Sequence, residues 1–262
     1  MRAEAFGRVP AARAAVAPAT WARRVPLVLG VATVVAQIAY PLVAGTARDR
    51  LTVVTVVVFC AASVTHALVW RGARFAAVLV VVTAGGGLLV EAAGVATGLP
   101  FGAYAYTGTL GWTALGVPVV IPLAWTMMAY PALLVGRRIA SGPLAGAVVA
   151  GWALASWDLF LDPQMVDAGH WTWVGGGPAV LGIPLTNFLG WFLVATAMMA
   201  VLWRLRGAGD HADDRVPFAL YLWTYCSSVL AHAAFFGLPG SAVLGGAGMG
   251  VVVAAFVRSI RR

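Results

Sequence analysis

The chain has 262 residues, of which 61% are hydrophobic and only 10% are charged. A soluble domain usually carries about 25% charged residues, so this composition could not cover a water-facing surface. The formal charge is +8, but all seventeen basic residues are arginines that lie in short clusters between apolar runs. Such scattered clusters form no continuous basic face, which argues against nucleic-acid binding. The composition therefore predicts an integral membrane protein.

Eight apolar runs are long enough to cross a bilayer, which takes roughly 20 residues. We expect spans at about 25–44, 51–70, 75–98, 118–136, 143–161, 184–203, 216–237 and 240–257. The sequence thus predicts an all-α bundle of eight transmembrane helices in one domain, 25–257, between a disordered N-terminal segment, 1–24, and a basic tail, 258–262. The first run could instead be a cleaved signal peptide, although it is longer than the 7–15 apolar residues typical of one.

The positions of the arginines predict how the chain crosses the membrane. Fifteen of the seventeen lie in the N-terminal segment, the C-terminal tail and alternate connections between the apolar runs. Only Arg48 and Arg50 lie in a connection on the opposite side. Because basic residues accumulate on the cytoplasmic side, we expect a multi-pass protein of the cell membrane with both termini in the cytoplasm.

Carboxylic acids inside the apolar runs are the first candidates for function. An ionisable side chain at membrane depth costs roughly 2.5 kcal/mol or more, so those present usually have a role. Glu91 shares a helical stripe with Gly87, Gly94 and Gly98, and small residues let another helix approach closely. The same spacing recurs in Gly151, Ala155, Asp158 and Asp162. We therefore expect the two acidic stripes to face one another or a shared cavity.

Polar and aromatic residues gather at the extracytoplasmic ends of the predicted spans and in the loops there. The loop after the third span carries Tyr104 and Tyr106, the loop after the fifth carries His170, Trp171 and Trp173, and Asn187 and His232 lie at the ends of two later spans. This convergence predicts an active site toward the extracytoplasmic leaflet. The alternatives are an interfacial belt for the tryptophans, a surface position for His170 and a bridging hydrogen bond for Asn187. His66, near the cytoplasmic end of its span, is expected to be structural.

Several familiar chemistries have no motif here. The chain lacks a serine nucleophile elbow, a zinc-binding His-Glu-x-x-His helix and a phosphate-binding loop. Asp158 and Asp162 resemble the aspartate pairs with which membrane prenyltransferases hold magnesium diphosphate, but a second aspartate cluster and basic loop residues are missing. These two aspartates could also form a metal site with His170 and His232, but no pair of the four has the spacing that is diagnostic of metal ligands.

Paired acids in a dry aromatic pocket suit a different reaction. Burial and a neighbouring carboxylate both disfavour ionisation, so one acid can stay protonated near neutral pH. Such an acid could protonate a carbon–carbon double bond, and aromatic faces could stabilise the cation. Water capture (hydration) and attack by an internal alkene (cyclisation) both remain open at this point.

Five sequence strings resemble the membrane carotenoid hydratases of the CruF type. They are EAAGVATGLPFGAYAY at 91–106, PLAWTMMAY at 122–130, WDLFLDP at 157–163, HWTW at 170–173 and GIPLTNFLGW at 182–191. The resemblance implies an all-helical enzyme without a cofactor. It also implies addition of water across the terminal 1,2 (or 1',2') double bond of an acyclic carotenoid end, giving a tertiary alcohol. Substrates of the gamma-carotene and bisanhydrobacterioruberin types both occur in this family.

On this basis we predict a carotenoid 1,2-hydratase whose substrate enters from the lipid phase, with other carotenoid pathway enzymes as candidate partners. We expect Glu91 or Asp158 to donate the proton and Asp162 to position the water. The predicted substrate-binding residues are Tyr104, Tyr106, Trp125, Tyr130, Trp157, His170, Trp173, Asn187, Trp191 and His232. Among these, Tyr106 and Asn187 orient the acids, while Trp125, Tyr130 and Trp157 line the channel for the polyene. A carotenoid cyclase, or a protein that only binds or transports carotenoids, is the alternative.

Overall fold

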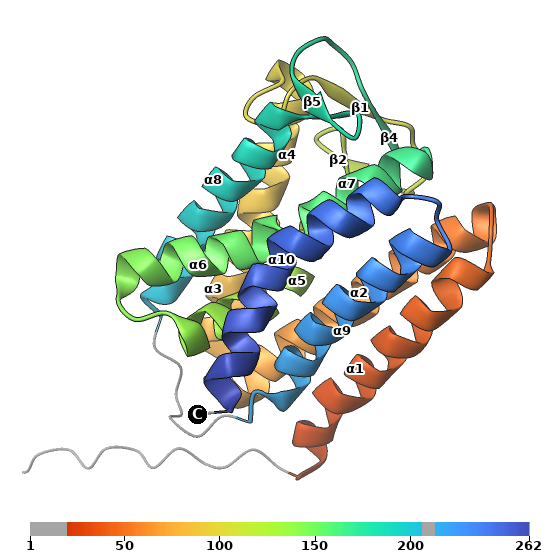
Figure 1. Ribbon diagram of the computed structural model, residues 1–262. Coiled ribbons are helices and arrows are strands. Elements are labelled where there is room, and N and C mark those ends of the chain that lie inside the picture. The colour runs from red at the N-terminus through yellow and green to blue at the C-terminus, as the bar shows by residue number, and fades with distance from the viewer. Residues whose placement is uncertain (1–19, 206–212, 262) are drawn as a thin grey trace, which may run out of the picture.

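The computed structural model describes residues 20–205 and 213–261 (Figure 1). Its helices are α1 (Thr20–Ala39), η1 (Tyr40–Leu42), α2 (Thr46–Arg71), α3 (Ala73–Val80), the π-helical turn η2 (Val81–Gly85), α4 (Gly86–Thr97), α5 (Val120–Ile139), α6 (Pro143–Ala155), α7 (Asp158–Asp167), α8 (Leu185–Trp203), α9 (Arg215–Ala234) and α10 (Pro239–Ile260). Short strands lie in two loops: β1 (Tyr104–Tyr106), β2 (Thr113–Ala114), β3 (Val117–Pro118), β4 (Trp171–Trp173), β5 (Ala179–Val180) and β6 (Ile183–Pro184).

The expected all-helical membrane fold is confirmed. Within the described residues, seven helical segments are long and apolar enough to cross a membrane, counting α3 with α4 and α6 with α7 as single segments. Helix α9 is the remaining predicted span, and it packs against α10, α5 and α1. Thr224, Ser227 and Ser228 of α9 line a cavity.

Helix α5 is the central helix of the bundle. In its most apolar stretch of 18 residues, 83% of the residues are buried, and the helix packs against α2, α6, α9 and α10. Small residues permit these contacts, since a Cβ added at Gly136 would lie 2.6 Å from the Cβ of Ala150 on α6. The cavity lies against the half of α5 that begins at Val120.

The two ends of the bundle differ in character. Figure 1 shows the strand-bearing loops together at one end and the C-terminal end of α10 at the other. At the second end Arg71 forms an ion pair with Asp214 at 2.6 Å, and Arg137 donates to the carbonyls of Leu202 and Leu205 at 2.9 and 2.8 Å. The predicted cytoplasmic arginines of the described chain therefore also serve to tie helix ends together.

The boundaries of the predicted terminal segments need correction. Residues 1–19 of the segment expected to be disordered lie outside the described residues, but α1 begins at Thr20 rather than near residue 25. The guanidinium of Arg23 lies 5.0 Å from the centre of the Trp70 ring, a cation–π contact that holds the first turn of α1 against α2. At the other terminus α10 continues to Ile260, so Arg258 belongs to the helix, where a basic side chain favours the last turn.

The fifth predicted span is also different, because it is broken after Ala155 and extends to Asp167. The N–H of Trp157 bonds the carbonyl of Leu154 at 3.2 Å, three residues back, which tightens the turn between α6 and α7. A Cβ at Gly151 would clash with the Thr196 hydroxyl oxygen, so α6 approaches α8 closely at this glycine. Asp158 and Asp162 accept from Asn187, which also lies on α8, so the glycine and the two aspartates face the same helix on either side of the turn.

Candidate active site

A cavity lies between α1, α2 and α9 on one side and α4, α5, α7 and α8 on the other. Strands β1 and β4 close it at the loop end of the bundle. Most of its surface is aromatic or aliphatic, and a few polar groups converge on it. Concave, largely apolar sites of this kind are typical binding sites for small molecules.

Glu91 is the most heavily hydrogen-bonded acid in the cavity. It is 4% exposed, and its Oε2 accepts from the hydroxyls of Tyr104 at 2.5 Å and Tyr106 at 2.9 Å. Its Oε1 accepts from the indole N–H of Trp125 at 3.0 Å. Three donors from two different elements thus hold the carboxyl group in one orientation.

The glycine stripe on α4 explains how these aromatic donors reach Glu91. A Cβ at Gly87 would lie 2.9 Å from Cδ1 of Trp125, and one at Gly94 would lie 2.8 Å from the hydroxyl of Tyr104. Both distances are too short for a real Cβ. The glycines therefore make room for the two rings on either side of the glutamate, as the stripe predicted for close approach.

Asp158 and Asp162 form a second acidic group, held by one amide. The Asn187 side-chain nitrogen donates to Oδ2 of Asp158 at 2.7 Å and to Oδ2 of Asp162. The two hydrogens of this NH₂ group are therefore shared between the two aspartates. Asp162 and Asn187 line the cavity, whereas Asp158 is fully buried behind them. The expected shared cavity is present for Glu91 and Asp162, although α4 and α7 come to it from different sides.

An antiparallel ladder joins the two aromatic loops. Strand β1 pairs with β4, with Tyr104 opposite Trp173 and Tyr106 opposite Trp171. Alternate residues of a strand share a face, so all four rings point toward the cavity. Burial, followed by the negative charge of Glu91, raises the pKa of Tyr104 and of Tyr106. Both phenols therefore keep the protons that they donate to Glu91.

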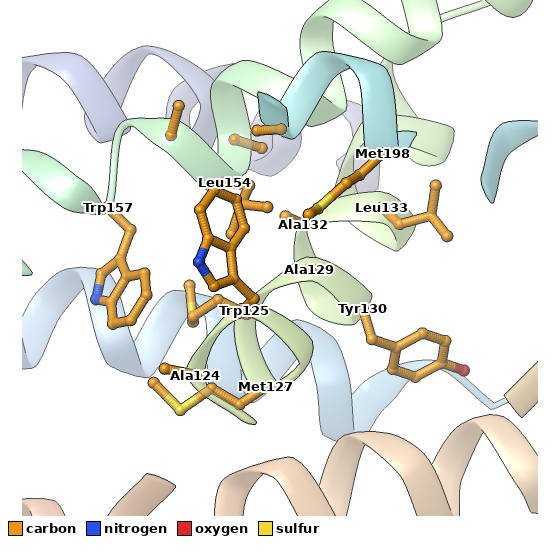
Figure 2. Close-up of a cluster of buried hydrophobic side chains, with 14 of the residues drawn as sticks. Ala124, Trp125, Met127, Ala129, Tyr130, Ala132, Leu133, Leu154, Trp157 and Met198 are labelled. Atoms are coloured by element: carbon orange, nitrogen blue, oxygen red, sulfur yellow. The ribbon is translucent and has the colours of Figure 1, made fainter. Parts of the chain in front are cut away.

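Three tryptophans form the wall beside the acids: Trp125 from α5, Trp191 from α8 and Trp157 from the turn before α7. The rings of Trp125 and Trp191 are stacked, with centroids 3.9 Å apart and planes 8° apart. Trp157 meets Trp191 edge-on, with centroids 6.3 Å apart. Figure 2 shows Trp125 rising from α5 and Trp157 to its left, attached to a different segment. Their π faces present negative electrostatic potential, which suits a cation or an extended polyene.

The structure places three of the predicted substrate-binding residues outside the cavity wall. The Tyr130 hydroxyl is 2.9 Å from Nδ1 of His66, on another face of α5 from Trp125 (Figure 2). Residues five apart on a helix point in directions that differ by about 140°, so Tyr130 cannot line the cavity wall that Trp125 lines. His170 is buried, but its Nδ1 meets the hydroxyl of Thr109 at 2.7 Å.

His232, the third of these residues, acts through a neighbour. Its Nε2 lies 3.1 Å from Oε1 of Gln164, and Gln164 lines the cavity. In the described stretches, no three His, Cys, Asp or Glu side chains gather as metal ligands would. The two histidines and the two aspartates considered as a metal site are therefore not brought together.

Several residues that line the cavity were not predicted from the sequence. They are neutral and polar: Gln37, Tyr40, Thr52, Thr55, Gln164, Thr224, Ser227 and Ser228. Glutamine is rare in a membrane helix, so Gln37 could have been identified from the sequence as a candidate, although it is not ionisable. Serine and threonine are weaker indications of a site, because their hydroxyls can bond within their own helix.

Comparison with known proteins gives one family and one curated relative. The model of a family described as carotenoid biosynthesis protein matches residues 51–258. The chain is also similar to the bisanhydrobacterioruberin hydratase of Haloarcula japonica, with 33% identity over 178 residues. This match covers 61% of the chain, and the chain spans 58% of the length of that relative. No solved structure matches the chain.

Proposed function

Because the chain belongs to the family of carotenoid biosynthesis proteins, we propose that it is a hydratase acting on an acyclic carotenoid. The reaction adds water across the terminal 1,2 (or 1',2') double bond of the end group and gives a tertiary alcohol. The observation that carries this proposal is the pair of buried acids, Glu91 and Asp162, that face one aromatic cavity. The hydratase name of the relative from Haloarcula japonica supports it.

We assign the proton donor to Asp162. The sequence led us to expect Glu91 or Asp158 in this role, but Asp158 does not reach the cavity. The three donors on Glu91 suit an ionised carboxylate rather than an acid with a proton to give. Two aspartates bridged by one amide repel each other when both are ionised, so the pair holds a proton between them.

The proposed steps balance in atoms and charge. Asp162 gives its proton to one carbon of the double bond, and the more substituted carbon becomes a tertiary cation. The Glu91 carboxylate and the faces of the tryptophans stabilise this cation. Water bonds to the cation and loses a proton to Glu91, and transfer of that proton to Asp162 restores the starting state.

An extended hydrocarbon matches the apolar part of the cavity. The rings of Trp125, Trp157 and Trp191 and the side chain of Leu161 all line it. We propose that the polyene enters laterally from the lipid phase, and that the site faces the extracytoplasmic leaflet. This orientation follows from the arginines, since the loops with β1 and β4 lie at the end opposite to the Arg71–Asp214 pair.

Expression in a host that accumulates an acyclic carotenoid, followed by mass analysis of the pigments, tests the function. We expect a product heavier than the substrate by one water. Asp162→Asn and Glu91→Gln should each abolish this product. Asp167→Asn, an exposed carboxylate on the same helix as Asp162, is the matched control and should leave the product unchanged.

The same experiment separates the alternatives. A product with the mass of the substrate but a shorter chromophore would indicate a cyclase, because cyclisation adds no atoms. Pigment that co-purifies with the protein and is chemically unchanged would indicate a carotenoid-binding or transport protein. Full activity in both acid variants would contradict the proposed mechanism.

A further inference from the structure

The cavity continues away from the acids into a region lined by neutral polar side chains. We call this region the neutral wall, and it consists of Gln37, Thr52, Thr55, Thr224, Ser227 and Ser228. These residues come from α1, α2 and α9, whereas the acids come from α4 and α7. The mechanism proposed above uses none of them.

Two polar atoms of the neutral wall have no partner in the described protein. Thr55 is 8% exposed, and neither its hydroxyl oxygen nor Oε1 of Gln37 has a hydrogen-bonding partner. The hydroxyls of Thr52 and Thr224, in contrast, are satisfied within their own helices, donating to the Arg48 carbonyl at 3.0 Å and the Leu220 carbonyl at 2.8 Å. A buried polar group without a partner is unfavourable, so two of them facing one cavity indicate a place for a polar ligand.

The chemistry of the wall defines the ligand. The cavity-lining residues that α1, η1, α2 and α9 contribute in the described chain include no carboxylate and no guanidinium. A charged ligand would therefore be uncompensated there. A hydroxyl group fits, because it can donate to Oε1 of Gln37 and accept from the hydroxyl of Thr55.

We propose that Gln37 and Thr55 form a second subsite that binds a neutral hydroxyl group, either the alcohol of a carotenoid or a water molecule. The identity of the ligand as a carotenoid rests on the proposed function. Gln37 precedes residues 51–258, which the family model matches. The subsite thus includes a residue from outside the segment that defines the family.

Binding and turnover measured on the full-length protein in detergent test this proposal. The ligands are lycopene and its 1-hydroxy derivative. Quenching of tryptophan fluorescence gives the Kd in protein that also carries Asp162→Asn, where no turnover is expected, and kcat is measured with Asp162 intact. The variants are Thr55→Val and Gln37→Leu, each removing one polar group at similar size. Thr65→Val, a threonine of α2 whose hydroxyl bonds the Ala61 carbonyl at 2.6 Å, is the control. Thr55→Ser keeps the hydroxyl and should behave as the wild type.

Two results would support the subsite and identify its ligand. If the alcohol of a carotenoid binds there, Thr55→Val and Gln37→Leu each raise the Kd of the hydroxylated ligand about fivefold, as expected for the loss of one neutral hydrogen bond. The Kd of lycopene does not change. If water binds there, both Kd values are unchanged and kcat on lycopene falls about fivefold. Thr65→Val should change neither quantity.

Two other results would overturn it. Equal weakening of both ligands in Thr55→Val would indicate lost packing, and no change in Kd or kcat would leave the subsite without a ligand. If the wild type binds both carotenoids but hydrates neither, the proposed function fails. The ratio of the two Kd values then decides whether the subsite binds the carotenoid alcohol, and an unchanged ratio rejects that ligand.

Discussion

The hydrogen bonds on Glu91 limit what this residue can do. Two phenol hydroxyls and one indole N–H point at its two oxygens. All three are donors whose protons are retained, so they favour a carboxylate over a neutral acid. A fixed negative charge beside a developing cation stabilises it without reorganisation, and this is the role that we expect for Glu91.

Removing one of these donors should therefore slow the reaction. In Tyr106→Phe the carboxylate keeps two of its three hydrogen bonds and can turn away from the cation. A hydrogen bond to a charged group is worth roughly 1.5–3 kcal/mol, so we expect the hydration rate to fall about ten- to hundredfold. Initial rates in membranes check this. Tyr225 lies outside the cavity wall, and its hydroxyl donates to the Gly246 carbonyl at 3.2 Å. Tyr225→Phe should therefore retain its rate. Equal rates in the two variants would contradict the role of Tyr106.

At the level of elements, the contact between α4 and α5 is what brings Trp125 to Glu91. Gly85 and Gly87 are close in sequence, but a Cβ at Gly85 would meet nothing within 4 Å, whereas one at Gly87 would lie 2.9 Å from Trp125. Gly87→Ala should displace the indole, lower the hydration rate and destabilise the fold by roughly 1–3 kcal/mol through overpacking. Gly85→Ala should keep its activity and its melting temperature. Activity and thermal unfolding of both variants check this, and a melting temperature unchanged in Gly87→Ala would contradict it.

The loop ladder contains a histidine that should make the fold sensitive to acid. Burial lowers the pKa of His170, and the carboxylate of Asp49, 3.9 Å from its Nε2, offsets this only in part. The unfolded chain therefore binds a proton near pH 6.5 while the folded state resists it. Stability contributed by neutral His170 is complete above about pH 6.5 and is lost as the pH falls from there toward the folded pKa. His170→Asn should show a smaller decrease of melting temperature with acid, and equal decreases would refute this assignment.

At the level of the whole molecule, local patterns predicted some parts of the site and not others. A glutamate in an apolar run with glycines at helical spacing is rare, so Glu91 could be identified from its neighbours in sequence. The turn that separates Gly151 from Asp158 could not, because it depends on how α6 packs on α8. The pairing of Tyr104 with Trp173 joins residues far apart in the chain, and sequence periodicity does not report such contacts.

Local sequence patterns also could not predict that α1 and α9, which lie far apart in the chain, line one cavity. The hydroxyl of Thr52 donates to the Arg48 carbonyl at 3.0 Å, as threonines in many helices do. Thr55, one turn later, also lines the cavity but has no such bond. Residues of the same type therefore have different roles, and only the arrangement of α1, α2 and α9 distinguishes them. The acids, in contrast, could be predicted because a carboxyl group at membrane depth is costly and is rarely kept without a role.

Filling the cavity from α9 should separate binding from folding. Ala231 lines the cavity, whereas Ala233, two residues on, is exposed on the outer side of the same helix. A carotenoid that binds only the folded state at a hundred times its Kd stabilises it by about 2.7 kcal/mol, which raises the melting temperature of the wild type. Ala231→Trp should abolish this rise, because the indole occupies the space that the polyene would fill, and Ala233→Trp should retain it. Thermal unfolding in detergent with and without lycopene checks this, and an undiminished rise in Ala231→Trp would mean that the carotenoid binds elsewhere.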